Sequence, residues 1–191
     1  MTLKPGVIDI YDFDKTIYDG DSSLDFFWFS LCKKPSLVIY LPYQIWHAIL
    51  FMIGLERRTN FKSHFFIFLH RIEAEKFADD FWQSHYKKIK SWYLGQDHSN
   101  DAIISASPEF LLKPVSIKLK VYALIATRIN PKTGRIDGEN CRGEEKVIRL
   151  NKDLHGLTIR RVYTDHASDA PLLALAKEKY FVKGTKVTKL N

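Results

Sequence analysis

The chain has 191 residues, which is enough for one compact core with room for a small inserted segment. Apolar residues make up 46% of it and charged residues 27%, so the composition is that of a globular protein and excludes a disordered or fibrous chain. The net charge of +7 favours anionic partners such as phosphorylated metabolites or lipid headgroups, although solubility alone explains it equally well.

Apolar runs and helix-like stretches alternate along most of the chain. Five apolar runs predict buried strands, at residues 7–12, 101–106, 122–127, 161–165 and 180–182. Helices are predicted near residues 108–118, 144–153 and 169–179, and a hairpin turn is predicted within 128–140. This alternation predicts an α/β fold with a Rossmann-like parallel sheet and helices on both faces.

Residues 21–97 interrupt the alternation. They are rich in aromatic residues, have a helical period and contain no good strand; residues 72–94 in particular read as one amphipathic helix. We therefore predict a core formed by residues 1–20 and 98–191, and a small all-helical cap, residues 21–97, inserted between the first two strands. Ligands of open α/β sheets bind at the carboxyl ends of the strands, so this position suits a lid.

Two aspartates, Asp12 and Asp14, directly follow the first predicted strand. On one face of one pocket, the two carboxylates would repel each other unless a cation or a proton intervened. The pair therefore indicates chemistry rather than packing, although a solvated loop with two surface aspartates would have the same sequence.

Further polar residues fall at the ends of other strands or at helix starts. Ser105 ends the second strand just before a helix start at Pro108, where free N–H groups would suit an anion. Lys146 lies early in a predicted helix, and Asp165 and Asp169 follow the fourth strand. Each signal is weak alone. Together, in this order and at these strand ends, they predict a single site.

The order of these motifs resembles the haloacid dehalogenase superfamily, and most of all its phosphoserine-phosphatase-like branch, in which a helical cap follows the first motif. The resemblance is carried by Asp12-x-Asp14-x-Thr16, Ser105, Lys146 and Asp165-x3-Asp169. Residues 105–110 and 140–147 also match that branch. Lys15 departs from the pattern, because many members carry Gly there, and it adds a cation beside the expected phosphate site.

The resemblance implies a Mg²⁺-dependent phosphomonoester phosphatase that works through an aspartyl-phosphate. Asp12 would be the nucleophile, and Asp14 would protonate the leaving oxygen and then activate water. Ser105 and Lys146 would hold the phosphoryl oxygens. The metal-binding residues implied are Asp12, Asp14, Asp165 and Asp169. Of these, Asp169 would act through water or as an orienting group.

Residues 35–55 form a run without a charged residue that is long enough to span a bilayer. Pro42 would break the helix, and basic pairs at both ends leave no charge asymmetry to orient a span. A polar stripe is formed by Ser36, Tyr40, Gln44 and His47. We therefore predict a helix that lies in the membrane interface. The alternatives are a soluble lid whose apolar face packs on the core, and a cap that forms a homodimer.

Membrane contact would favour a lipid phosphate substrate, similar to a phosphatidylglycerophosphate; otherwise a small phosphorylated metabolite is expected. One alternative is a phosphotransferase of the same fold. Another is a non-catalytic basic and aromatic module, with Lys87, Lys88 and Lys90 as its footprint on membrane or nucleic acid. The complete set of motifs argues against this module, so we expect no nucleic-acid partner.

The cysteine pattern and the N-terminus bear on location. Cys32 and Cys141 provide neither a zinc set nor a disulfide framework, which fits a reducing compartment, and no signal peptide is visible. We expect a cytoplasmic protein, located at the inner face of the membrane if the interface prediction holds.

Overall fold

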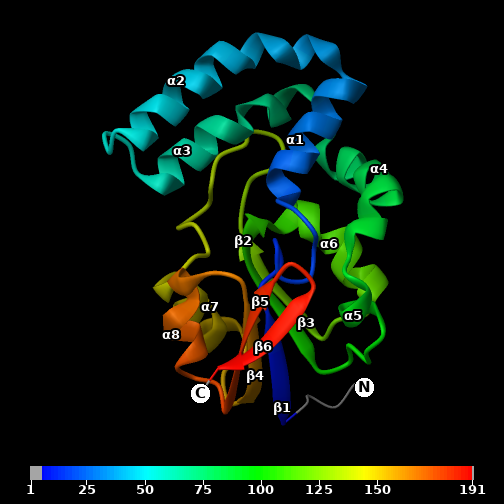
Figure 1. The fold of residues 1–191 in the computed structure, drawn as a ribbon. Coiled ribbons are helices and arrows are strands. Elements are labelled where there is room, and N and C mark those ends of the chain that lie inside the picture. The colour runs from blue at the N-terminus through cyan, green and yellow to red at the C-terminus, as the bar shows by residue number, and fades with distance from the viewer. Residues whose placement is uncertain (1–5, 191) are drawn as a thin grey trace.

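The computed structural model describes residues 6–190, which form a six-stranded sheet in the order β3-β2-β1-β4-β5-β6 (Figure 1). The strands are β1 (Val7–Tyr11), β2 (Asp101–Pro108), β3 (Ala123–Thr127), β4 (Thr158–Thr164), β5 (Glu178–Lys183) and β6 (Lys186–Leu190). Strands β1 to β5 pair in parallel, which confirms the predicted Rossmann-like sheet. The sequence analysis missed β6, a short antiparallel edge strand that pairs with β5.

Helices occupy the segment between β1 and β2 and the connections between the later strands. The first group comprises α1 (Ser22–Lys33), η1 (Pro35–Tyr40), α2 (Leu41–Met52), α3 (Arg58–Phe65), η2 (Phe66–Arg71), α4 (Ala74–His85), η3 (Tyr86–Lys88) and α5 (Ser91–Leu94). The second group comprises α6 (Glu109–Leu119), α7 (Glu144–Asp153), η4 (Ala167–Asp169) and α8 (Ala170–Leu173). Helices α6 and α7 lie where the sequence predicts them. In the described part of the chain, no helix is both long enough and apolar enough to cross a bilayer.

Two helix predictions were wrong in extent. The helix expected over residues 169–179 ends at Leu173, because Glu178 and the residues after it pair with β4, and this pairing overrides their helical propensity. The helix expected over residues 72–94 is broken at Ile89, which is extended and bridges to Tyr18. Lys90 N donates to the Ile17 carbonyl at 2.8 Å, so backbone contacts with the turn after β1 replace one helical turn.

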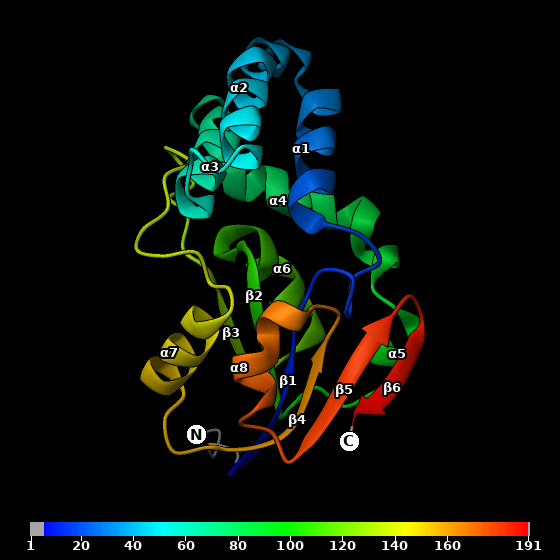
Figure 2. The same ribbon diagram turned by 60° about the vertical axis from the view of Figure 1, so that its left-hand side comes forward.

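Apolar side chains of the sheet point alternately to two cores. Ile8 and Ile10 of β1 face α7 and α8, where they form one cluster with Leu150 of α7 and Leu172 of α8. On the other face, α4, α5 and α6 pack over the sheet and over a large aromatic cluster that begins at Tyr11. Helices therefore cover both faces, as predicted (Figure 2).

The segment between β1 and β2 contains helices and no strand, and α1, α2 and α3 lie above the carboxyl ends of β1 and β2 (Figure 1). Helix α4 instead packs against α6. Its Trp82 packs edge-on against Phe13 and donates a hydrogen bond to the Leu111 carbonyl at 2.6 Å. The segment is thus tied into the core at α4, and the division into a core and a cap at residues 20 and 98 stays a prediction.

The loop between β3 and α7 also touches the inserted helices. It closes on a bridge between Ile129 and Ile136, which confirms the predicted turn. Gly134 has φ +75° and lies so close to the Phe66 carbonyl that a side chain would collide with it, so only glycine fits. Ile136 N donates to Ser63 Oγ at 3.1 Å. The loop therefore links α3 to the carboxyl end of the sheet.

Candidate active site

A tight turn after β1 presents both aspartates of the first motif. Asp12 N donates to the Tyr163 carbonyl at 2.9 Å, which holds the end of β1 against β4. Lys15 has φ +57°, a left-handed conformation that turns the chain back after Asp14, and its N–H donates to the Gly20 carbonyl at 3.0 Å. A glycine would adopt this conformation without strain, whereas a lysine rarely does.

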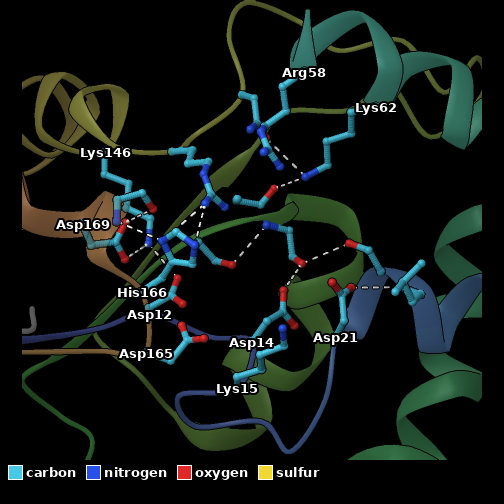
Figure 3. A pocket seen from close by; sticks show the side chains of 18 of the residues that line it. Asp12, Asp14, Lys15, Asp21, Arg58, Lys62, Lys146, Asp165, His166 and Asp169 are labelled. Atoms are coloured by element: carbon cyan, nitrogen blue, oxygen red, sulfur yellow. Dashed lines mark hydrogen bonds and ion pairs between the residues drawn. The ribbon is translucent and has the colours of Figure 1, made fainter. Parts of the chain in front are cut away.

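A cavity of about 350 Å³ opens at the carboxyl ends of the strands, beneath α3 (Figure 3). All the predicted site residues line it: Asp12, Asp14, Ser105, Lys146, Asp165 and Asp169. They come from the carboxyl-terminal parts of three strands or the residues just after them, from α7 and from η4. The structure therefore brings together every candidate that the strand-end pattern selected.

Lys146 is the centre of a buried ionic cluster. Its ammonium lies 2.6 Å from Asp12 Oδ1 and 2.7 Å from Asp169 Oδ2, and its side chain is 3% exposed. Burial lowers the pKa of Lys146, but the carboxylates of Asp12 and Asp169 outweigh it, so the pKa is raised and the ammonium stays charged. Asp169 also accepts a hydrogen bond from Thr164 Oγ1 at 2.9 Å. This arrangement favours an orienting role for Asp169 over direct metal binding.

Asp14 sits in a shell of hydroxyl and backbone donors. Ser22 N donates to its Oδ1 at 2.7 Å, and the Ser107 hydroxyl donates to its Oδ2. Burial, reinforced by the charge of Asp21, raises the pKa of Asp14 to about 6 in spite of these donors. A carboxyl with such a pKa can both give and take a proton near neutrality, which general acid–base catalysis requires.

The carboxyl of Asp12 is also hard to ionise. Burial raises its pKa to about 7, Lys146 opposes this, and Asp169 adds to it. A divalent cation bound near Asp12 and Asp14 would lower the pKa of both carboxyls, because it favours their charged forms.

Asp12 and Asp165 offer carboxylate oxygens to the cavity, and the backbone carbonyl of Asp14 is a further oxygen donor (Figure 3). The Thr16 hydroxyl donates to Asp165 Oδ1 at 3.5 Å, which links the turn after β1 to the end of β4. Oxygen ligands with room for water suit Mg²⁺, which binds few protein carboxylates and keeps several waters. The residues present therefore fit this ion.

Several lining residues escaped the sequence analysis. Lys62 of α3 donates to the Ala106 carbonyl and to Asn140 Oδ1, the latter at 3.3 Å, and burial lowers its pKa to about 8. Arg58, one turn earlier, also lines the cavity. No motif marks these two residues, because they belong to the inserted segment, whose position depends on its tertiary packing.

Residues near the recognised motifs were missed for a different reason. Ser107 lies two residues after Ser105, and its N–H donates to Ser105 Oγ at 3.1 Å, so the repeated serine was a readable signal. His166, next to Asp165, also lines the cavity, and Arg142 Nη2 lies 3.2 Å from its Nε2. Arg142 and His166 therefore form part of the wall that a substrate would meet.

Comparison with known proteins defines the class. A family model described as haloacid dehalogenase-like hydrolase matches residues 10–174. This match covers most of the chain, so the chain belongs to the haloacid dehalogenase-like hydrolase family and is an enzyme of the hydrolase class. The assignment made from its motifs is thereby confirmed.

Individual proteins match the chain in sequence or in fold. Protein CicA of Caulobacter vibrioides is 38% identical over 84 residues, which span 40% of this chain and only 37% of CicA. A crystal structure of a protein with unknown function from Bordetella pertussis matches with a TM-score of 0.74 and 18% identity, over 91% of this chain and 88% of that one. A phosphoserine phosphatase, solved as a phospho-aspartyl intermediate analogue, matches with a TM-score of 0.57 and 16% identity, over 93% and 86%. At such identities the two structures establish a shared fold.

Proposed function

We propose that this chain is a Mg²⁺-dependent phosphomonoester phosphatase that acts through an aspartyl-phosphate on Asp12. The observation that carries the proposal is the buried Lys146 ammonium, which holds Asp12 at 2.6 Å inside a cavity shared with Asp14, Ser105 and Asp165. The ammonium favours the ionised form of Asp12, and a bound Mg²⁺ would favour it further, which is what a nucleophile for a phosphate dianion requires. The shared fold of the phosphoserine phosphatase supports the assignment.

The reaction has two steps. Asp12 attacks the phosphorus, the bond from phosphorus to the leaving oxygen breaks, and Asp14 gives that oxygen a proton. Asp14 then takes a proton from water, the water oxygen attacks the phosphorus, and the bond to Asp12 breaks with release of inorganic phosphate. Ser105 and Lys146 hold the phosphoryl oxygens throughout. Mg²⁺, held by Asp12, Asp14 and Asp165 and oriented through Asp169, would supply charge neutralisation between nucleophile and phosphate.

The test is hydrolysis of a chromogenic aryl phosphate and a panel of phosphomonoesters, with Mg²⁺ and with a chelator. We expect loss of activity by at least about 10³-fold in Asp12→Asn, since residues that act as a unit in a covalent mechanism are each essential. Acid-quenched wild-type protein should carry phosphate that Asp12→Asn lacks. Full turnover by Asp12→Asn would refute the mechanism.

Added alcohols separate hydrolysis from transfer. A phosphotransferase would phosphorylate a good acceptor in preference to water, whereas a phosphatase should release inorganic phosphate in nearly every turnover. A non-catalytic module would instead show salt-dependent binding to anionic surfaces that is unaffected by Asp12→Asn.

A lipid phosphate at a membrane surface is the substrate class that α2 favours. This helix points Ile45, Trp46 and Met52 outward, with exposures of 55, 58 and 73%, while Gln44 is buried and 5% exposed. Gln44 and the half-buried His47 of the predicted polar stripe thus face the protein, whereas Ser36 lies in η1 and is exposed. The apolar residues of α2 face outward, which is the reverse of a helix adapted to water. In the sequence, the basic residues Lys34 and Arg57 flank this segment and would complement anionic headgroups.

In this arrangement the protein would work at the cytoplasmic face of the membrane, with α3 between the lipid surface and the cavity. Sedimentation with vesicles containing anionic lipid should capture the wild type, and the Trp46→Gln/Met52→Gln variant should remain in the supernatant. A small phosphorylated metabolite becomes the better substrate class if the wild type ignores the vesicles. The third alternative is that a second copy of the chain covers this surface, and analytical ultracentrifugation would detect the resulting dimer.

A further inference from the structure

A second group of metal-binding side chains lies away from the catalytic cavity, between α2 and α3. His47 projects from α2, Glu56 from the connecting loop, and His64 from the last turn of α3. One ligand atom from each of the three lies within 4.8 Å of the other two. None of the three lines the catalytic cavity, so the catalytic reaction does not account for them.

The two imidazoles converge on one carboxylate. His47 Nδ1 lies 3.0 Å from Glu56 Oε2, and His64 Nε2 lies 3.2 Å from Glu56 Oε1. The Glu56 side chain is 8% exposed, so its charge is largely removed from water and must be compensated by hydrogen-bond donors or by a cation. Within residues 6–190, the ion-pair partners of Glu56 are these two imidazoles. A neutral imidazole brings no positive charge to offset the carboxylate.

The surroundings of His64 resemble those of a metal-binding histidine. The Tyr43 hydroxyl lies 2.6 Å from His64 Nδ1, so the nitrogen on the far side of the ring already has a partner. Such an outer hydrogen bond fixes the tautomer and orientation of a metal-binding imidazole. The rings of His47 and His64 stack with centroids 3.6 Å apart, so a common centre requires each ring to turn slightly about its Cβ–Cγ bond.

We propose that His47, Glu56 and His64 bind one divalent transition-metal ion, with Zn²⁺ as the best match, and that this ion fastens α2 to α3. Two imidazoles and one carboxylate are a ligand set that proteins use for zinc with an open fourth position, and the side chains are 16, 8 and 33% exposed, which leaves water access to that position. Because α3 carries Arg58 and Lys62 into the cavity, the ion would stabilise one wall of the catalytic site. The inference does not depend on the chemistry proposed for Asp12.

The test is titration of chelator-treated protein with Zn²⁺ in a buffer that contains excess Mg²⁺, followed by calorimetry and by metal analysis after gel filtration. The wild type should retain one equivalent of zinc. Each of His47→Gln, Glu56→Gln and His64→Gln should weaken binding by at least about tenfold, the loss expected when a zinc site is disturbed. His155→Gln is the matched control, because His155 is an exposed histidine in a distant loop. Asp165→Asn should also keep its zinc, which separates this site from the catalytic carboxylates.

Two further measurements protect the test from misfolded variants. Zinc should raise the melting temperature of the wild type and of His155→Gln but not that of His64→Gln. Zinc K-edge absorption of the wild type reports the ligands directly, and two imidazole nitrogens at about 2.0–2.1 Å are expected. Absence of stoichiometric zinc, an all-oxygen ligand shell, or equal binding by the three variants and the wild type would each overturn the proposal.

Discussion

Replacement of Lys146 by methionine tests the ionic cluster on which the proposed site depends. The ammonium lies 2.6 and 2.7 Å from the carboxylates of Asp12 and Asp169, whose side chains are 13 and 3% exposed. Methionine keeps most of the volume but leaves two buried carboxylates facing each other without a cation. Removal of one partner of a buried ion pair typically costs about 3–5 kcal/mol, so we expect the free energy of unfolding to fall by that amount at pH 7 without added metal.

The assay is urea unfolding followed by the fluorescence of the four tryptophans. A second substitution, Asp169→Asn, removes one of the stranded charges, so the double variant Lys146→Met/Asp169→Asn should be more stable than the sum of the single changes by at least about 1 kcal/mol. Lys152→Met is the matched control, because Lys152 is exposed on the same helix. A loss below about 1 kcal/mol in Lys146→Met, or strict additivity in the double variant, would refute the reasoning.

Three other predictions follow from the same contacts. Burial raises the pKa of Asp12 to about 7 and that of Asp14 to about 6, above the value of about 3.9 in an unfolded chain. Without metal, the free energy of unfolding measured in urea should therefore increase as the pH falls from about 7 to about 4. Saturating Mg²⁺ should flatten this pH dependence, because it favours the charged carboxylates. The Lys62 ammonium has a pKa lowered to about 8, so the KM for an anionic substrate should rise as the pH passes 8, whereas Lys62→Met should show a high KM at every pH. Trp82→Phe leaves the buried Leu111 carbonyl without its 2.6 Å donor and should cost about 1–3 kcal/mol in urea unfolding; no loss would mean that this hydrogen bond does not stabilise the attachment of α4.

The catalytic candidates could be predicted from the sequence because parallel strands impose a shared edge. Asp12 and Asp165 follow neighbouring strands, and Ser105 lies near the carboxyl end of β2 on the other side of β1. A parallel sheet with these three strands adjacent therefore brings the three residues together. Lys146 needed only the additional assumption that its helix begins at the same edge. Topology, rather than the chemistry of any one residue, made the prediction possible.

The residues of the inserted segment could not be predicted in this way. Arg58 and Lys62 reach the cavity because α3 lies across it, and the position of α3 results from aromatic packing that has no short sequence signature. The strand β6 was missed for a related reason. It lies at an exposed edge where Val187 is partly buried and its neighbours are exposed, so no alternating apolar pattern marks it.

Helix α2 illustrates the limit of pattern analysis most clearly. The helical period correctly places Gln44 and His47 on one stripe, but a period cannot say whether that stripe faces water or protein. In the structure, Gln44 donates to the Phe65 carbonyl at 2.6 Å and His47 approaches Glu56, so the stripe faces α3. A lid that packed its apolar face on the core would have the opposite orientation. The orientation found leaves the apolar face free for an external partner, and vesicle binding by the wild type and the Trp46→Gln/Met52→Gln variant decides whether that partner is a membrane.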